Sequence, residues 1–167
     1  MAEVTLTACA AFQNRTELRS PDIFIDVRDD LTLASFAAFD GRSPEVMTAI
    51  KTAYGVDLPQ RRGGRDLETE LKPLLADMAA VVDQTDARAV MRVSGSRARD
   101  VLAKGVPLDL HAREFKPNHV AITHASHIAV LLWQIDDGPT YEIAMFRSFA
   151  QSFADWLMHS AAEYTGG

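Results

Sequence analysis

Residues 119–147, HVAITHASHIAVLLWQIDDGPTYEIAMFR, decide the fold. Apolar runs, and apolar side chains that alternate with polar ones, predict strands at about 119–125, 127–135 and 140–147. Residues 136–139, DDGP, have the composition of a tight hairpin turn. The middle strand is almost continuously apolar, which is typical of a strand that is central or covered on both faces. The stretch therefore predicts a meander of neighbouring strands.

A short helix with marked ends precedes this meander. It lies within residues 94–111, SGSRARDVLAKGVPLDLH, and should span about 96–104. Ser94 or Ser96 can cap the free amides at its start, and Gly105 suits its end. Its core-facing residues fall at helical spacing and are Ala98, Val101 and Leu102. These features explain the clear start and end of this helix without any bound ligand.

The N-terminal half predicts two more strands and two more helices. Residues 23–30, IFIDVRDD, alternate as a strand does, and residues 31–41 favour a second strand that ends in an Asp-Gly turn. Ser43-Pro44 suits the start of a helix, since serine is a good N-cap and proline fits the first helical position. Residues 67–80 have a helical apolar period, but Pro73 predicts a kink or a late start.

A final helix is predicted close to the end of the sequence. Ser148 can act as its N-cap, and Gln151 stands where the second member of a capping box belongs. One face of this helix is apolar and consists of Phe149, Phe153, Trp156, Leu157 and Ala161. Together these elements predict an α+β fold, with an antiparallel or mixed sheet and flanking helices.

Composition indicates one globular domain over residues 1–167, with residues 1–20 poorly ordered and residues 58–66 forming a mobile loop. The net charge of -6 and a pI near 5.3 leave no broad basic field for nucleic acid. A single cysteine, Cys9, cannot form an internal disulfide. No signal peptide or membrane-spanning run is recognisable, so we expect a cytoplasmic protein.

Candidate catalytic and metal-binding residues are weak. His119, His124 and His127 cluster in sequence, but no cysteine or acid lies at ligand spacing beside them, which favours surface histidines. Asp109 and His111 resemble a dyad, yet no nearby nucleophile completes a catalytic set. We therefore assign no catalytic, cofactor-binding or metal-binding residue.

A group of basic side chains is more informative. Residues 87–93, ARAVMRV, predict a half-buried strand whose outer face carries arginines, and the next helix adds two more. In an acidic chain, such cations form either a solvated face or a docking surface for an acidic partner. The candidate docking residues are Arg88, Arg92, Arg97 and Arg99.

Several short sequence motifs occur in an order that is known from a protein family. They are Ser94-Gly95, ARDVLAKG at residues 98–105, PLDLH at residues 107–111, RSFA at residues 147–150 and DWL at residues 155–157. From about Ala80 onward this order resembles the gamma subunit family of heterotetrameric sarcosine oxidase. The earlier half resembles the family loosely, chiefly through YGVDLP at residues 54–59. Two departures are Val106 in place of a cysteine, and residues 60–75 in place of a strand pair.

The resemblance implies a fold similar to the folate-binding domain of the glycine-cleavage aminomethyltransferase. It implies a non-catalytic subunit that docks on a large alpha subunit, alongside beta and delta subunits, in a complex that demethylates sarcosine or a related N-methyl amino acid. FAD, FMN, NAD and tetrahydrofolate are then implied for the whole complex and none for this chain. A stand-alone folate-binding or aminomethyltransferase-like domain is the alternative, and an orphan homologue without its partner is a third possibility.

Overall fold

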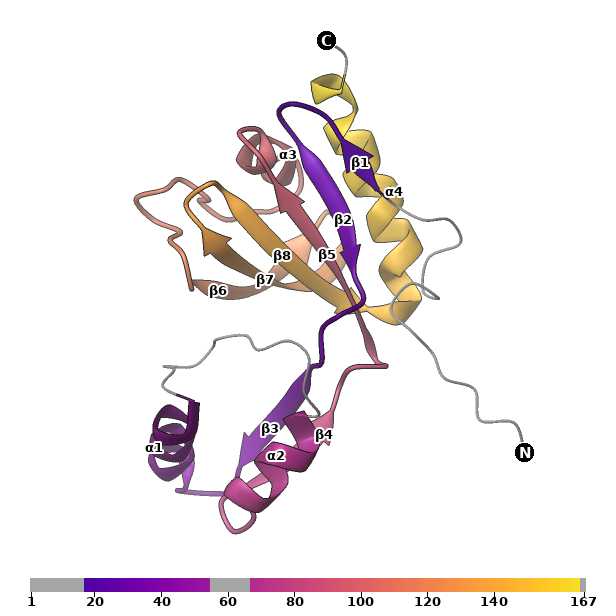
Figure 1. Ribbon diagram of the computed structural model, residues 1–167. Coiled ribbons are helices and arrows are strands. Elements are labelled where there is room, and N and C mark those ends of the chain that lie inside the picture. Colours follow the sequence, from indigo (N-terminus) through magenta and orange to yellow (C-terminus); the bar gives the residue numbers. More distant parts are fainter. Residues whose placement is uncertain (1–16, 55–66, 166–167) are drawn as a thin grey trace, which may run out of the picture. The chain divides into compact units, whose positions relative to one another are not determined.

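The computed structural model describes residues 17–54 and 67–165, which fall into two compact units (Figure 1). The larger unit combines Met1–Asp29 with Asp86–Gly167, and the smaller unit is Asp30–Thr85. The single domain over residues 1–167 stays a prediction. The predicted mobile loop at 58–66 lies outside the described residues. Of the stretch 1–20, which was predicted to be poorly ordered, only residues 17–20 are described.

The larger unit is built on a six-stranded sheet in the order β1-β2-β5-β8-β7-β6. All of its neighbouring strands pair antiparallel, which confirms the α+β class with an antiparallel sheet. The predicted meander is present as β6, β7 and β8. The strands are β1 (Leu18–Arg19), β2 (Phe24–Arg28), β5 (Arg88–Ser94), β6 (Val120–Ala125), β7 (Ile128–Asp136) and β8 (Thr140–Phe146).

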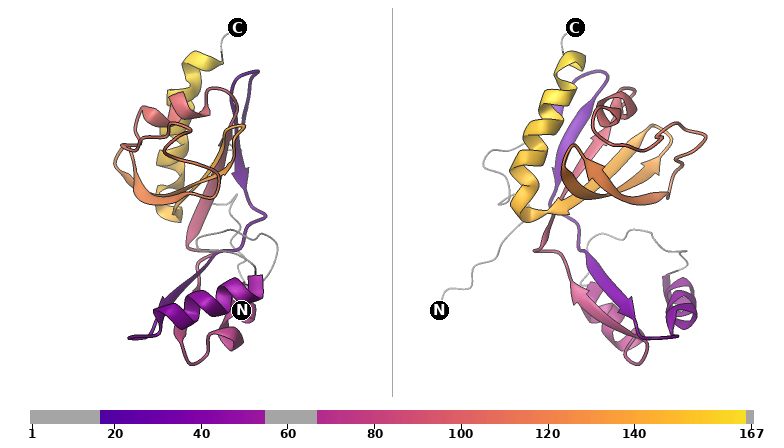
Figure 2. Two further views of the ribbon diagram at one scale, coloured as in Figure 1. Left: turned by 90° about the vertical axis from the view of Figure 1, so that its left-hand side faces the viewer. Right: turned by 180° about the vertical axis from the view of Figure 1, so that it is seen from behind.

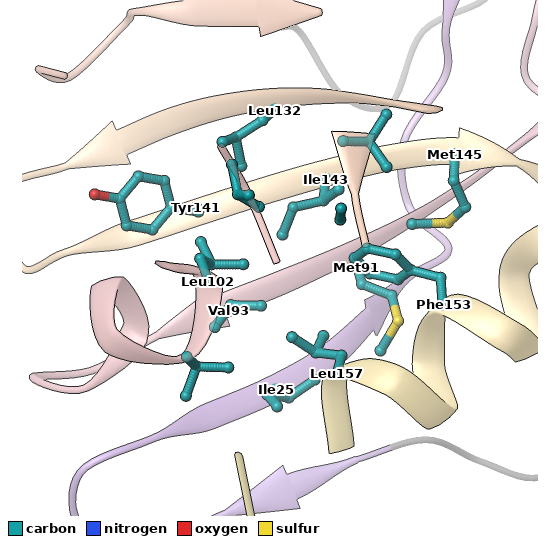
Figure 3. Packing of buried hydrophobic residues seen from close by; sticks show 14 of the residues in the cluster. Ile25, Met91, Val93, Leu102, Leu132, Tyr141, Ile143, Met145, Phe153 and Leu157 are labelled. Atoms are coloured by element: carbon teal, nitrogen blue, oxygen red, sulfur yellow. The ribbon is translucent and has the colours of Figure 1, made fainter. Parts of the chain in front are cut away.

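Two helices, α3 (Ala98–Ala103) and α4 (Ala150–Ala161), pack on one face of this sheet (Figures 1 and 2). Short 3-10 turns at Arg147–Phe149 and Ala162–Tyr164 flank α4. Figure 3 shows the resulting core, in which strand residues such as Met91 and Ile143 meet Phe153 and Leu157 of α4. The apolar period of the last helix therefore predicted its buried face, although Phe149 is 46% exposed.

The helix starts differ from those predicted. No side chain caps α3, because Ser96 Oγ donates to Asp22 Oδ1 (2.8 Å) and the chain turns at Gly95, whose φ is +109°. The predicted capping box of the last helix is also absent. A 3-10 turn occupies Arg147–Phe149, α4 begins at Ala150 without a side-chain cap, and Gln151 Nε2 donates to Asp155 instead.

Gly105 is required by close packing and not by a left-handed helix end, since its φ is not positive. A Cβ placed on it would lie 2.5 Å from Cζ2 of Trp156 and 2.9 Å from the backbone nitrogen of Ser126. The amide of Ser126 in turn donates to the carbonyl of Gly105 (2.8 Å). The absence of a side chain therefore lets α3, α4 and the β6–β7 turn meet at one point.

We expect Gly105→Ala to lower the free energy of unfolding by about 1–3 kcal/mol, because an added methyl group overpacks this junction. Urea unfolding of the two proteins measures the difference. In the Gly105→Ala background, Trp156→Leu should cost less than it does alone, since the smaller side chain relieves the clash. Strictly additive losses would show that the two residues do not meet.

The smaller unit is a two-stranded antiparallel sheet with two helices. It consists of β3 (Ala34–Ala38), α1 (Ser43–Tyr54), α2 (Leu67–Leu74) and β4 (Ala79–Asp83). Val46 and Ile50 of α1 pack with Leu71 and Leu75, whereas Met47 is 45% exposed. The predicted late start near Lys72 is wrong, because α2 begins at Leu67; it ends at Leu74, one residue after the proline and well before the predicted residue 80. Residues 67–74 of this helix fall in the stretch where the resemblance implied a strand pair.

Candidate interaction surface

The face of the six-stranded sheet opposite α3 and α4 carries an unusual row of polar side chains. The strand registers align Asp26 with Arg92, Arg92 with Glu142, and Glu142 with Trp133. Directly opposed residues of antiparallel strands point to the same face, so this row crosses β2, β5, β8 and β7. We call the group of Arg28, Arg92, Trp133 and Glu142 the Glu142 cluster.

Glu142 is completely buried at the centre of this cluster. Its Oε1 accepts hydrogen bonds from Arg28 Nη1 (2.9 Å) and from Arg92 Nη2 (2.7 Å) and Nε (3.1 Å). Its Oε2 accepts from the indole Nε1 of Trp133 (3.0 Å). The donors come from three different strands, and both arginine side chains are mostly buried, 13% and 28% exposed. Because bonds to a charged acceptor are the stronger ones, the carboxylate fastens four strands in register.

Arg88 belongs to the same face but to a different contact. Its guanidinium carbon lies 3.8 Å from the centre of the Phe146 ring, its register partner on β8. Partial burial lowers the pKa of Arg88 from its usual value. Phe146 remains 45% exposed. This stacked pair adds an accessible cation and an aromatic ring beside the Glu142 cluster.

Arg97 and Arg99 lie on the opposite side of the sheet, because α3 packs there. Arg97 is exposed; its Nη1 donates to Asp100 Oδ2 (2.9 Å) and its guanidinium lies 5.6 Å from the ring centre of Tyr164. Asp100 therefore pairs with Arg97, and Lys104 of the same segment pairs with Glu163. Arg99 is half-buried, and its Nε donates to the carbonyl of Leu110 (2.9 Å). The four candidate arginines therefore form two separate pairs.

A second buried polar group lies beneath Arg99. Tyr141 and Gln134 are register partners on the helix-covered face, and each is at most 1% exposed. Neither the hydroxyl of Tyr141 nor Oε1 of Gln134 has a hydrogen-bond partner by distance and angle. Burial raises the pKa of Tyr141, and the nearby Arg99 opposes that shift. The guanidinium of Arg99 therefore lies near the hydroxyl of Tyr141.

The histidine candidates do not assemble into a site. His119 makes an edge-to-face contact with Phe115, while His124 and His127 are exposed. Within residues 17–54 and 67–165, no group of three potential metal ligands comes together. Asp109 Oδ1 accepts from the backbone amide of His111, and His111 Nδ1 accepts from that of Arg113. The side chains of Asp109 and His111 therefore both accept hydrogen bonds from backbone amides of the same turn.

Comparison with known proteins assigns the family. The profile of the sarcosine oxidase, gamma subunit family matches residues 63–163, which is more than half of the chain. The chain belongs to this family. The match includes β4 to α4, and so it contains Arg92, Trp133 and Glu142 of the Glu142 cluster.

Curated members of the sarcosine oxidase gamma subunit family agree with this assignment. The chain is 35% identical over 102 residues to the sarcosine oxidase subunit gamma of Corynebacterium sp. (strain P-1) and 32% identical to that of Arthrobacter sp.. Each match covers 60% of this chain, and the chain spans about half the length of these relatives.

A solved structure shares the fold. It is a chain of the heterotetrameric sarcosine oxidase from Corynebacterium sp. U-96 in complex with pyrrole 2-carboxylate, with a TM-score of 0.81 at 22% identity. The match covers 99% of this chain and 98% of the other. Among the described helices, none has the length and apolar character needed to cross a bilayer.

The sequence did not indicate the Glu142 cluster. Arg28, Arg92 and Glu142 lie far apart along the chain, and only the strand register brings them together. One signal was present: Glu142 stands between apolar residues in TYEIAMF, where an acid at the centre of a strand needs a partner if it is buried.

Proposed function

We propose that this chain is a non-catalytic subunit of a sarcosine-oxidase-type complex, which oxidatively demethylates sarcosine or a related N-methyl amino acid in the cytoplasm. Its role is to bind a large alpha subunit, in an assembly that also has beta and delta subunits. The observation that carries the proposal is the match of residues 63–163 to the gamma subunit family. The fold shared with a chain of a heterotetrameric sarcosine oxidase supports it.

We assign the cofactors of such a complex, FAD, FMN, NAD and tetrahydrofolate, to the other subunits. The chemistry of the described residues supports this assignment. The most deeply buried acid, Glu142, is engaged through both of its oxygens by Arg28, Arg92 and Trp133. A carboxylate held by two guanidinium groups and an indole is kept ionised and serves structure, so it is badly suited to take up or release a proton in a reaction.

The same observation weakens the alternative of a stand-alone folate-binding domain. A folate site of this fold needs a buried acid that hydrogen-bonds the pterin, and Glu142 already accepts from three side chains. The second buried polar group, Tyr141 with Gln134 and Arg99, contains no acid. Folate binding through a buried acid of residues 17–54 or 67–165 would therefore have to break the Glu142 cluster.

The four arginines enter the proposal with different roles. Arg92 and Arg99 make internal hydrogen bonds, so reversing their charge should destabilise the fold as well as any interface. Arg97 is exposed and Arg88 is half-buried against Phe146, and among the described residues neither makes a hydrogen bond to a buried residue like those of Arg92 and Arg99; the two lie on opposite faces of the sheet. Charge reversal at either of these two positions therefore tests docking more cleanly than a change at Arg92 or Arg99.

Co-expression with a sarcosine oxidase alpha subunit from the same organism tests the proposal. We expect the tagged chain to co-purify with a flavin-containing complex, and the chain expressed alone to be colourless. Arg97→Glu should slow association and weaken its salt dependence, with little change in the unfolding midpoint, if this arginine faces the partner. Arg88→Glu is the matched variant on the other face.

Each outcome of this experiment is informative. If the wild-type chain never co-purifies with the alpha subunit, the proposed function is wrong. A flavin absorbance band retained by the isolated chain would show that it binds a cofactor itself. Unchanged association of both charge-reversal variants would leave the subunit role intact and remove these two arginines from the interface.

A further inference from the structure

The two edges of the six-stranded sheet are protected to different degrees. At one edge, β1 is only two residues long and carries the exposed Arg19, paired with Glu17. At the other edge, β6 is six residues long, VAITHA, and contains no Lys, Arg, Asp, Glu or Pro. Its register with β7 is continuous from Val120 to Ala125, without a bulge. Natural sheets protect exposed edges by short length, charge, proline or bulges, and β6 has none of these.

The free backbone groups of β6 can be assigned from its turn. Ser126 and His127 form a two-residue connection closed by the register partners Ala125 and Ile128, and Ser126 has a φ of +55°. Such a turn makes its closing pair a hydrogen-bonded pair, and hydrogen-bonded and non-bonded pairs alternate along the ladder. The amides and carbonyls of Ile122 and His124 therefore point away from β7, toward the open edge.

The side chains at this edge are also exposed, so a partner can contact them. Ile122 is 84% exposed, and His124 beside it is exposed as well. Both lie on the face of the sheet that α3 and α4 leave open, next to their β7 partners Leu131 and Ala129. An edge strand without a bulge, a proline or a Lys, Arg, Asp or Glu side chain, and with an exposed isoleucine, is a template for another strand.

The side chains near this edge favour a partner other than a second copy of this chain. Residues 115–135 contain no Asp or Glu, although the whole chain has 23 acids, and they hold Lys116 together with three of the five histidines. A second copy would bring the same acid-free stretch against itself. Lys116 and the three histidines are exposed and can donate hydrogen bonds, so an extended segment with acidic side chains, which accept them, is complementary to this stretch.

We propose that β6 is the site where the alpha subunit adds an extended, acidic segment to the sheet as a seventh strand. This inference rests on the proposed function and specifies its contact. Main-chain hydrogen bonds to Ile122 and His124 supply the affinity, and the side chain of Ile122 packs against the added strand.

Substitutions at Ile122 separate backbone pairing from side-chain packing. Ile122→Pro removes an amide that points to the open edge and leaves the β6–β7 ladder intact. The matched control, Ile122→Thr, keeps the amide and the β-branched shape but shortens the apolar side chain. Both proteins are co-expressed with the alpha subunit, and the dissociation constant is measured. Circular dichroism checks their folding, and His124→Pro replaces Ile122→Pro if the latter unfolds.

We expect Ile122→Pro to weaken binding at least about tenfold and Ile122→Thr to weaken it by less than about threefold, since the added strand depends on main-chain bonds. Equal binding by the proline variant and the wild type would overturn the strand addition and leave the subunit role intact. An equal loss in both variants would also overturn it, because side-chain packing would then dominate. A self-association that Ile122→Pro abolishes would identify a second copy as the occupant. Absence of wild-type binding would refute the proposed function itself.

Discussion

Replacing Glu142 with Gln is expected to lower the free energy of unfolding by roughly 3–5 kcal/mol, because the change leaves buried charges without their partner. Arg28 and Arg92, whose side chains are 13% and 28% exposed, both direct hydrogen bonds to Oε1 of this carboxylate. An amide can still accept from them through its oxygen, but its NH₂ group then faces the indole N–H of Trp133, which is itself a donor. Urea unfolding followed by circular dichroism measures the loss.

Asp100→Asn provides the matched control for this prediction. It makes the same acid-to-amide change in the pair that Asp100 forms with Arg97, whose side chains are 48% and 52% exposed. Exposed ion pairs contribute at most about 1 kcal/mol, so this variant should remain close to the wild type. Equal losses in the two variants would mean that the Glu142 cluster does not hold the strands together.

The faces on which the four candidate arginines lie could not be predicted from the sequence. Arg88, Arg92, Arg97 and Arg99 are close in sequence, which suggested a single surface. The chain reverses at Gly95, where φ is +109° and a side chain's Cβ would lie 2.4 Å from the carbonyl oxygen of Asp22, so the turn requires glycine. The strand therefore presents its arginines on one face while α3 packs on the other. Spacing along the chain cannot reveal such a reversal, and the distant partner Glu142 is equally hidden.

The pattern of apolar residues predicted most of the fold. The three strands of the meander and the strand before it lie within a residue or two of their predicted positions, because alternation and turn composition are local signals. Capping residues were less informative. Ser96 found a partner in Asp22, 74 residues earlier, and a 3-10 turn took the place where Ser148 was expected to cap a helix. These choices depend on tertiary contacts that composition does not specify.

The burial of Trp156 also differs from what the sequence predicted. The helical stripe predicted it to be buried, but it is half-buried, and its ring lies over Gly105 and 5.6 Å from the ring of Phe153. Phe153 instead is completely buried and lies among Met91, Met145 and Leu157 in the main core (Figure 3). The free energy of unfolding should therefore depend more on Phe153 than on the larger tryptophan.

Phe153→Ala is expected to lower the free energy of unfolding by about 3–5 kcal/mol, the usual cost of removing a fully buried aromatic ring and leaving a cavity. The backbone around it belongs to a regular helix and a continuous sheet, so the core has little freedom to collapse into the space. Urea unfolding of the purified chain measures this loss, and near-ultraviolet circular dichroism reports whether the packing around Trp156 persists.

Phe149→Ala is the comparison that makes this prediction specific. It deletes the same ring four residues earlier, on the same predicted apolar stripe, but Phe149 is 46% exposed and belongs to the 3-10 turn before α4. Because much of its surface is already in water, its removal should cost less than about 1 kcal/mol. A loss at Phe149 as large as that at Phe153 would mean that the buried stripe extends into the 3-10 turn before α4 and that the ring of Phe149 packs in the core.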